Sequence, residues 1–397
     1  MTTSEEKIDI SERYAYEGPR TPSQAEWEDA VELCRSIFFG NIPNHQEAYS
    51  TWPMHFRPEA RESTFVMLYQ GQPVSSINRL CRDIVVRGQA LRMGFIGGVC
   101  TYPDHRGKGL AGTVLYATLQ RFADDDVDFV YISGARPLYY RSGANHIGNS
   151  PVFFLTSDAQ KSVDTKGLKI REAILADVEI LRSLNESEET RIVHDTLDYE
   201  IVIQHGYCSG GQCMFGIVES GSTPVAYIAL RGVEEKEGRW SQRVIEFAGD
   251  REAILFALST KADEFGPNGH FVMEVRAEDE LIDRLGAMGV RSEVGRKGGT
   301  VKILNFTRTM EKLLPYFASQ LGTAFAESLE FTAGSERYVA AGEGGSLEID
   351  GEANMLWTLL GNPPDKQREN VRATGLMEEA LETCLPLPLP ALYLNTI

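Results

Sequence analysis

Residues 94–112 read GFIGGVCTYPDHRGKGLAG, and this stretch decides how the first part of the chain is expected to fold. The apolar pattern over 90–101 indicates a strand, and the pattern over 113–123 indicates an amphipathic helix. Between them lies a loop that holds Arg106, Lys108 and several glycines. A glycine loop that opens a helix exposes backbone N–H groups, and the helix dipole adds partial positive charge. The stretch therefore predicts a binding site for a phosphate or pyrophosphate group.

Gly107, Gly109 and Gly112 also match the GxGxxG pattern of dinucleotide-binding proteins. The context disfavours that interpretation, because residues 102–106 separate the strand from the first glycine. The strand-like runs upstream are joined by short turns, which indicates antiparallel hairpins rather than a parallel sheet. The acidic residue expected about 20 positions further on is also absent. The sequence contains no GxxxxGK[ST] loop, so a nucleoside triphosphate is not expected.

The segment Arg106-x-x-Gly109-x-Ala111 resembles the (Q/R)xxGx(G/A) motif of the GCN5-related N-acetyltransferase superfamily. The predicted order of elements fits that superfamily too: a helix over 23–39, antiparallel strands, the motif strand, a long helix, a strand over 129–133 and a short helix over 137–142. The resemblance implies acetyl-CoA as the acyl donor and no metal. It implies that the coenzyme contacts Val99, Cys100, Thr101, Arg106, Gly107, Lys108, Gly109, Leu110, Ala111 and Ser133.

The chain is also similar in length and order to the enhanced-intracellular-survival type of acetyltransferase, whose motif strand resembles Gly97-Gly98-Val99 followed by Pro103 and His105-Arg106. This resemblance implies an α+β chain with tandem acetyltransferase folds, a sterol-carrier-like α/β domain at the C-terminal end, and hexamers. Asp250 and Glu252 stand where a second copy would need its phosphate loop, and both would repel a phosphate. The expected divisions are a flexible 1–20, a catalytic domain over 21–160, a degenerate copy over 161–299 and the sterol-carrier-like domain over 300–397.

Transfer of an acetyl group to a primary amine by direct attack needs a polarised thioester carbonyl, a base and an acid. A backbone N–H of the motif strand, with Val99 favoured, is expected to polarise the carbonyl. Tyr139 lies four residues before Gly143 and matches the Tyr-x-x-x-Gly of the superfamily, in which the tyrosine protonates the leaving thiolate. The alternative is that Tyr139 only packs the short helix.

The base is less obvious, because the motif strand carries no carboxylate between Ala90 and Thr101. The resemblance implies that the C-terminal carboxylate, here on Ile397, takes this role. Glu47, His55 and Asp83 are alternatives that could act through water, or ordinary structural residues. His105 is expected to be structural. Trp52 and Phe56 either line the acceptor pocket or belong to the core.

Composition limits the other possibilities. The 397 residues carry a formal net charge of −18, and 42% of them are hydrophobic, which excludes a largely disordered chain and disfavours a general nucleic-acid binder. Residues 1–160 hold 15 basic and 19 acidic side chains, so most of the acidity lies later. Six scattered cysteines, no signal-peptide pattern and no apolar run of about 20 residues favour a cytoplasmic protein away from membranes. The expected acceptor is a small amine or a lysine-containing protein; the alternatives are an acyl-CoA sensor without catalysis and an acyltransferase with another donor.

Overall fold

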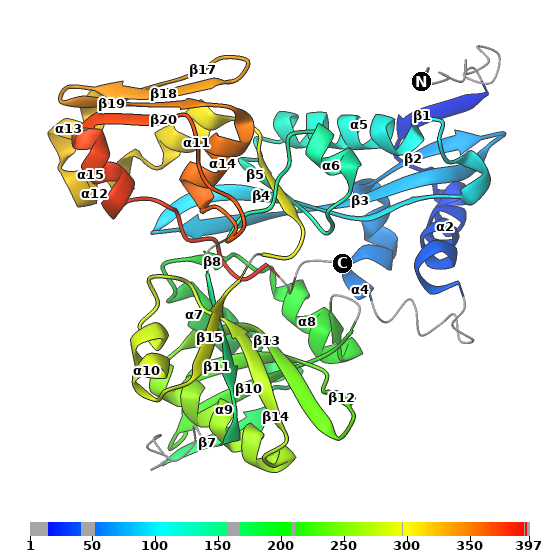
Figure 1. Ribbon diagram of the computed structural model, residues 1–397. Helices are drawn as coiled ribbons and strands as arrows, with labels where there is room; N and C mark the ends of the chain where they lie inside the picture. Colours follow the sequence, from blue (N-terminus) through cyan, green and yellow to red (C-terminus); the bar gives the residue numbers. More distant parts are fainter. Residues whose placement is uncertain are drawn as a thin grey trace.

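The computed structural model describes residues 15–40, 52–148, 150–157, 167–208, 211–295, 297–392 and 394. In this part of the chain the strands form three sheets of seven, nine and four strands. Figure 1 shows the first and the third sheet side by side, with the second below them. The mixed α+β architecture agrees with the expectation from the sequence.

The first sheet has the order β1–β2–β3–β4–β5–β16. Its strands β1 to β4 are antiparallel neighbours, whereas β4 and β5 run parallel. On β2, Val66 and Leu68 pack with the helix α2 and Met67 packs with α5, so the two helices cover opposite faces. The bounds are β1 (Tyr16–Arg20), α2 (Trp27–Phe39), α4 (Pro53–Phe56), β2 (Thr64–Tyr69), β3 (Gln72–Val86), β4 (Gln89–Thr101), α5 (Leu110–Asp124), β5 (Phe129–Ile132) and α6 (Pro137–Arg141).

Residues 16–20, which we expected to be loose, form the edge strand β1 along β2. Tyr16 anchors the strand, because its ring lies 5.1 Å from the ring of Tyr69. Pro19 has no N–H to donate, and an edge strand is where a sheet tolerates it. The polar composition of this segment hid a strand that the contacts of Tyr16 and one ladder of hydrogen bonds hold in place.

Two short strands pair in a different sheet from the strands that are next to them in the sequence. β6 (Pro151–Leu155) lies in the second sheet between β14 (Gly269–Glu274) and β15 (Arg291–Val294). β16 (Thr300–Ile303) pairs antiparallel with β5 in the first sheet. The sheets therefore divide the chain at other places than residues 160 and 299, where the sequence suggested boundaries.

The second sheet has the order β15–β6–β14–β13–β11–β10–β7. On β11, Ala226 and Ile228 pack with α9, whereas Tyr227 and Ala229 pack with α7 and α8 on the other face. β13 and β14 run parallel, with α9 between them in the chain. The bounds are β7 (Leu168–Glu172), α7 (Val178–Glu186), β8 (Arg191–Ile192), α8 (Thr196–His205), β9 (Tyr207–Cys208), β10 (Gly211–Ser220), β11 (Thr223–Arg231), β12 (Glu234–Lys236), β13 (Arg239–Gly249), α9 (Arg251–Phe265) and α10 (Leu281–Ala287).

The third sheet is an antiparallel β17–β18–β19–β20, and its helices share one apolar core with the first sheet. Ile84 and Phe95 of the first sheet belong to the same cluster as Phe306 and Phe331. α11 and α12 are two separate helices that meet at Leu313, and Pro315 lies in the first turn of the second. The bounds are α11 (Phe306–Lys312), α12 (Leu314–Leu321), α13 (Thr323–Ser328), β17 (Glu330–Ala333), β18 (Arg337–Gly342), β19 (Gly345–Asp350), α14 (Glu352–Leu360), β20 (Val371–Gly375) and α15 (Leu376–Thr383).

The proline-rich tail after α15 runs back between the first and second units (Figure 1). The N–H of Leu387 donates to the carbonyl of Leu359 at 2.7 Å. Leu394 is 1% exposed and lies in the core cluster of α7 and α8, together with Met54 of α4. Ile397 lies outside the described residues. In the described part of the chain, no helix is long and apolar enough to cross a membrane.

Candidate active site

The first feature of the site is the place where β4 and β5 separate. The two strands pair only from Met93 to Ile96 on β4, opposite Phe129 to Ile132 on β5. The N–H of Ser133 makes a last bond to the carbonyl of Ile96 at 3.0 Å. β4 continues to Thr101 without β5 beside it. Backbone groups of a strand need partners, so this edge of β4 is available to a ligand.

A β-bulge at Gly98 lies at the start of this open edge. Ser76 pairs with Cys100 and Asn78 with Gly97, so two residues of β4 oppose one of β3. Gly98 has φ +58°, and a Cβ there would collide with the side-chain oxygen of Asn78. Only glycine fits this position. Bulges redirect the neighbouring residue, which here is Val99.

The glycine loop leads from β4 into α5. Gly107 and Gly109 have φ +80° and +79°, and nothing lies within 4 Å of a Cβ built at either. Gly109 is the N-cap of α5, and no side chain caps this helix. The first-turn N–H groups of a helix lack partners within the helix, so they can bind an anion that approaches the open loop.

Side chains hold the loop in this shape. The Nε of Arg106 donates to the carbonyl of Thr101 at 3.1 Å, which ties the loop to the end of β4. The Nδ1 of His105 lies 2.9 Å from the hydroxyl of Tyr16, and its ring also contacts Tyr69. His105 therefore anchors the loop to β1 and β2. This is the structural role that we expected for it.

The open edge and the loop border a cleft of about 560 Å³. Lys108 and Ser133 are not among its lining residues: the ammonium of Lys108 lies 5.7 Å from the ring of Tyr16, and Ser133 directly follows β5. The other predicted coenzyme contacts line it, namely Val99, Cys100, Thr101, Arg106, Gly107, Gly109, Leu110 and Ala111.

The sequence reasoning missed five lining residues outside the glycine loop, one of which is Leu138 of α6. Arg136 and Arg141 line it from α6, and Ile37 and Phe38 line it from α2. None of the described lining residues is acidic, although the chain as a whole carries −18. The chain order brings both arginines near the motif strand, because α6 follows β5, its parallel neighbour. This wall makes the cleft a local site for an anion.

Tyr139 lies on α6 between the arginines but is only 3% exposed. Its ring packs in the same apolar cluster as Val130 and Ile132. Burial raises the pKa of Tyr139, and the nearby Arg136 opposes that shift. The phenol therefore keeps its proton at neutral pH. Tyr139 is not itself among the lining residues of the cleft, whereas its neighbour Leu138 is.

The candidates for the base lie elsewhere. Asp83 is on β3 and its carboxylate is 3.9 Å from Arg92, away from the cleft lining. His55 is 5% exposed, and its Nε2 has no hydrogen-bond partner among the described residues. Burial, with the positive charges of Arg82 and Arg57, lowers the pKa of His55 to about 3. Glu47 and Ile397 lie outside the described residues.

Trp52 and Phe56 belong to the core under α2. They are 8% and 5% exposed and share an apolar cluster with Trp27 and Leu33. Phe38 provides an aromatic wall of the cleft instead, with its ring 5.1 Å from that of Trp52. Trp52 and Phe56 are therefore core residues, and neither is among the lining residues of the cleft.

Residues 18–146 match the family model described as an acetyltransferase (GNAT) domain. This part of the chain is therefore similar to GNAT acetyltransferase domains. The match ends before β6, which is the strand that lies in the second sheet. The GNAT domain therefore consists of the first sheet up to β5 with its helices, and it contains the whole cleft.

Solved structures show a similar fold over nearly all of the chain. A GCN5-related N-acetyltransferase from Anabaena variabilis is 14% identical, with a TM-score of 0.64, covering 94% of this chain and 96% of its own. One from Kribbella flavida is 13% identical, with a TM-score of 0.63 and coverage of 94% and 97%. Eis1 from Mycobacterium abscessus is 13% identical, with a TM-score of 0.52 and coverage of 73% and 74%. No curated protein matches the sequence.

Proposed function

We propose that the protein is an acetyl-CoA-dependent N-acetyltransferase that acts on a primary amine. One observation carries the proposal: the cleft between β4 and β5 ends on the N-terminus of α5, which no side chain caps, and its described lining includes Arg106, Arg136 and Arg141 but no acidic residue. An acyl-CoA is an extended molecule with a negatively charged pyrophosphate at one end and a thioester at the other. The cleft offers backbone groups along its length and positive charge at the loop.

The residues present fit this ligand. The N–H groups from Gly107 to Ala111 and the guanidinium of Arg106 would hold the pyrophosphate. The open edge of β4 from Val99 to Thr101 would pair with the amide groups of the pantetheine, much as a strand would. The thioester would then lie near the bulge at Gly98.

The reaction forms a C–N bond and breaks a C–S bond. In our proposal the N–H of Val99 donates a hydrogen bond to the carbonyl oxygen as negative charge develops on it. The proton of the attacking amine passes to the α-carboxylate of Ile397. The phenol of Tyr139 gives its proton to the departing thiolate. The raised pKa of Tyr139 supports its part, because an acid must hold its proton until that step.

The place of the tail supports the role of Ile397. Leu394, three residues before it, is buried beside Met54, at the junction of α4 with the second unit. At Leu394 the tail therefore lies where the first unit meets the second.

We also propose that the second unit is a degenerate acetyltransferase copy and that the third is the sterol-carrier-like domain. The parallel pair β13 and β14 with α9 between them repeats the arrangement β4–α5–β5. The carboxylate of Asp250 accepts from the N–H of Ala253 at 2.8 Å, so a negative charge fills the helix N-terminus that Gly109 leaves open on α5. This copy is expected to bind no coenzyme.

Two measurements test the proposal. Calorimetry with acetyl-CoA should show binding to the full chain, and a thiol-release assay over a panel of amines should show turnover on some of them. Absence of acetyl-CoA binding would contradict the proposed function. Binding without turnover on any amine would favour the second candidate, an acyl-CoA-binding protein without catalysis. The lack of a carboxylate among the described lining residues is the observation behind that candidate.

A further inference from the structure

Two cysteines meet where α2 packs on the motif strand. Cys34 on α2 and Cys100 on β4 are free thiols, 1% and 4% exposed, and they belong to one apolar cluster. The Sγ of Cys34 also reaches the bulge, since a Cβ built on Gly98 would lie 3.2 Å from it. This thiol pair, Cys34 and Cys100, therefore lies at the part of β4 where the reactive end of an acyl-CoA is proposed to bind.

The two thiols differ in their access to the cleft. Cys100 is one of its lining residues, whereas Cys34 is not. The interaction with the thiol of Cys100, together with burial, raises the pKa of Cys34. Because a thiolate is the form that attacks a disulfide, Cys34 keeps its proton and Cys100 is the thiol placed to react first. The proposed acetyl transfer uses neither thiol.

We propose that Cys100 is a modification site for a disulfide of coenzyme A, and that Cys34 is the thiol that resolves the product. This inference rests on the proposed function, which brings the sulfur of a bound coenzyme close to the bulge at Gly98. A disulfide of coenzyme A carries the same pyrophosphate and pantetheine as an acyl-CoA. The cleft would therefore deliver its S–S bond to Cys100.

The chemistry is two successive thiol–disulfide exchanges. The thiolate of Cys100 attacks one sulfur of coenzyme A disulfide, which gives a mixed disulfide and releases one coenzyme A thiol with the proton that Cys100 lost. Cys34 then attacks the sulfur of Cys100, which forms the Cys34–Cys100 disulfide and releases the second coenzyme A thiol with the proton of Cys34. The two cysteines lose two electrons, and coenzyme A disulfide takes up both.

The first exchange also prepares the second. The thiol of Cys100 is the first cause of the raised pKa of Cys34, and the mixed disulfide removes that thiol. Cys34 then gives up its proton more easily and can attack. Both products obstruct the cleft. The mixed disulfide fills the open edge of β4, and the Cys34–Cys100 disulfide ties α2, which carries the wall residue Phe38, to the motif strand.

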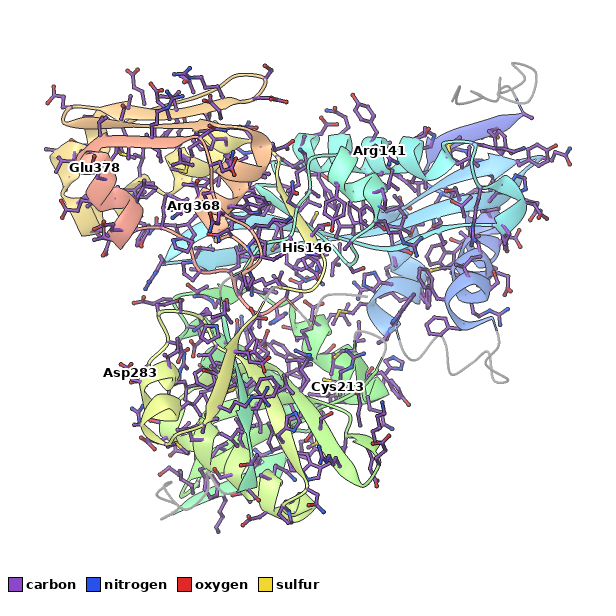
Figure 2. The ribbon with its side chains drawn as sticks, viewed as in Figure 1. Arg141, His146, Cys213, Asp283, Arg368 and Glu378 are labelled. Atoms are coloured by element: carbon purple, nitrogen blue, oxygen red, sulfur yellow. The ribbon has the colours of Figure 1, made fainter. Side chains whose placement is uncertain are left out.

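The second unit provides a matched control pair. Cys208 and Cys213 are 2% and 7% exposed, and their thiols also interact with each other. They lie on the neighbouring strands β9 and β10, and neither lines the cleft. Figure 2 shows Cys213 in the second unit and Arg141, a lining residue of the cleft, in the first. A disulfide delivered by the cleft should oxidise the first pair and spare this one.

The test treats the full chain with coenzyme A disulfide or with glutathione disulfide at equal concentration, and follows non-reduced peptides by mass spectrometry. Coenzyme A disulfide should form the Cys34–Cys100 link at least about tenfold faster, because a bound reagent reacts as if at high concentration. Cys34→Ser should stop at a coenzyme A adduct on Cys100, and Cys100→Ser should form none. Cys208→Ser should react like the wild type.

The wild type alone also decides the matter if a variant does not fold. An excess of acetyl-CoA should slow its reaction with coenzyme A disulfide, and the linked protein should lose acetyl-CoA binding until dithiothreitol restores it. Equal rates with the two disulfides, or equal oxidation of Cys208 and Cys213, would overturn the proposal. So would an unreactive Cys100 in a protein that binds acetyl-CoA by calorimetry, and that result would leave the acetyltransferase standing. No acetyl-CoA binding would overturn both.

Discussion

Tyr139 and Tyr140 are neighbours on α6 but lie in different surroundings. Tyr139 is 3% exposed and packs under the cleft wall, whereas Tyr140 is 40% exposed and its ring lies 5.8 Å from that of His146. The raised pKa of Tyr139 comes from burial. The two phenols therefore allow the acid role to be tested against a local control.

Tyr139→Phe is expected to lower kcat about a hundredfold, because general acid catalysis typically contributes at least that much. Acetyl-CoA affinity should stay within about twofold, since the ring still packs in the same cluster. Tyr140→Phe should leave both quantities unchanged. The measurements are steady-state kinetics and calorimetry on the two variants. A Tyr139→Phe enzyme with full kcat would show that this tyrosine only packs the helix.

Gly98→Ala is expected to destabilise the protein and weaken acetyl-CoA binding together. A left-handed backbone costs an L-residue about 1–2 kcal/mol, and the new methyl would also collide with the Asn78 amide. Gly88→Ala is the matched control, because Gly88 has φ +76° but open space around its Cβ. Urea unfolding should show a larger loss for the first variant. Equal losses would mean that the bulge relaxes without cost.

The glycines of the loop could be predicted from the sequence, because their function depends on the backbone alone. The positive φ of Gly107 and Gly109 follows directly from the residue type in a strand–loop–helix context. Arg136 and Arg141 could not be predicted in the same way. Their place in the cleft depends on how α6 lies against α5, and that depends on tertiary packing.

At the scale of elements, α14 of the C-terminal unit holds the segment that follows α6. The indole N–H of Trp357 donates to the carbonyl of His146 at 2.9 Å, and the N–H of Gly148 donates to the carbonyl of Gly361 at 3.1 Å. The carboxylate of Glu352 lies where a side chain on Gly143 would be, and it pairs with Lys302. The position of α6, and so of its tyrosine, depends on this contact.

A double-mutant cycle tests this contact. Gly143→Ala should lower stability and kcat, because its methyl would overlap the carboxylate of Glu352 and its φ of +88° disfavours alanine. Glu352→Ala removes the overlap but not the backbone strain. The double variant should therefore recover part of the loss, with a coupling free energy of about 1–2 kcal/mol. Strict additivity of the two changes, measured by urea unfolding, would contradict the contact.

β6 and β16 each join a sheet other than the one formed by their neighbours in the sequence, and the sequence pattern does not predict this. Both are short apolar runs, and either could complete the sheet nearest to it in the chain. Phe153 and Leu155 are buried in the second core, whereas Val301 and Ile303 are buried in the first. Periodicity predicted most long strands and helices correctly, because each carries its own apolar face. It cannot decide which of two cores a short strand joins.

At the scale of the whole molecule, a chain of buried charges joins the first two units. The Nε of Arg82 on β3 donates to the carboxylate of Asp198 on α8 at 2.6 Å. The Nε2 of His194 lies 2.8 Å from the carboxylate of Glu246 on β13. The hydroxyl of Tyr227 donates to the same carboxylate at 2.6 Å. A cation at His194 therefore stands between two carboxylates of the second unit, and one of them, that of Asp198, also binds Arg82 across the junction.

The buried charges around His194 predict a loss of stability at alkaline pH. Burial alone would lower the pKa of His194, but Glu246 and Asp198 raise it to about 9. Because the pKa of His194 is raised in the folded state, protonated His194 stabilises the fold fully below its ordinary pKa near 6.5. This stabilisation is lost as pH rises through about 9. The contribution is on the order of 3 kcal/mol, because each unit of pKa corresponds to about 1.4 kcal/mol.

The free energy of unfolding should therefore fall between pH 7 and 9.5 in the wild type, and the fall should be smaller in His194→Gln. His205→Gln is the matched control, since His205 is exposed at the end of α8. The measurement is urea unfolding of the three proteins at several pH values. The difference between wild type and His194→Gln isolates this group from the lysines and cysteines, which titrate in both. If the wild type and His194→Gln keep the same pH dependence, His194 is neutral, and the carboxylates of the junction are held by Arg82 and Tyr227 without it.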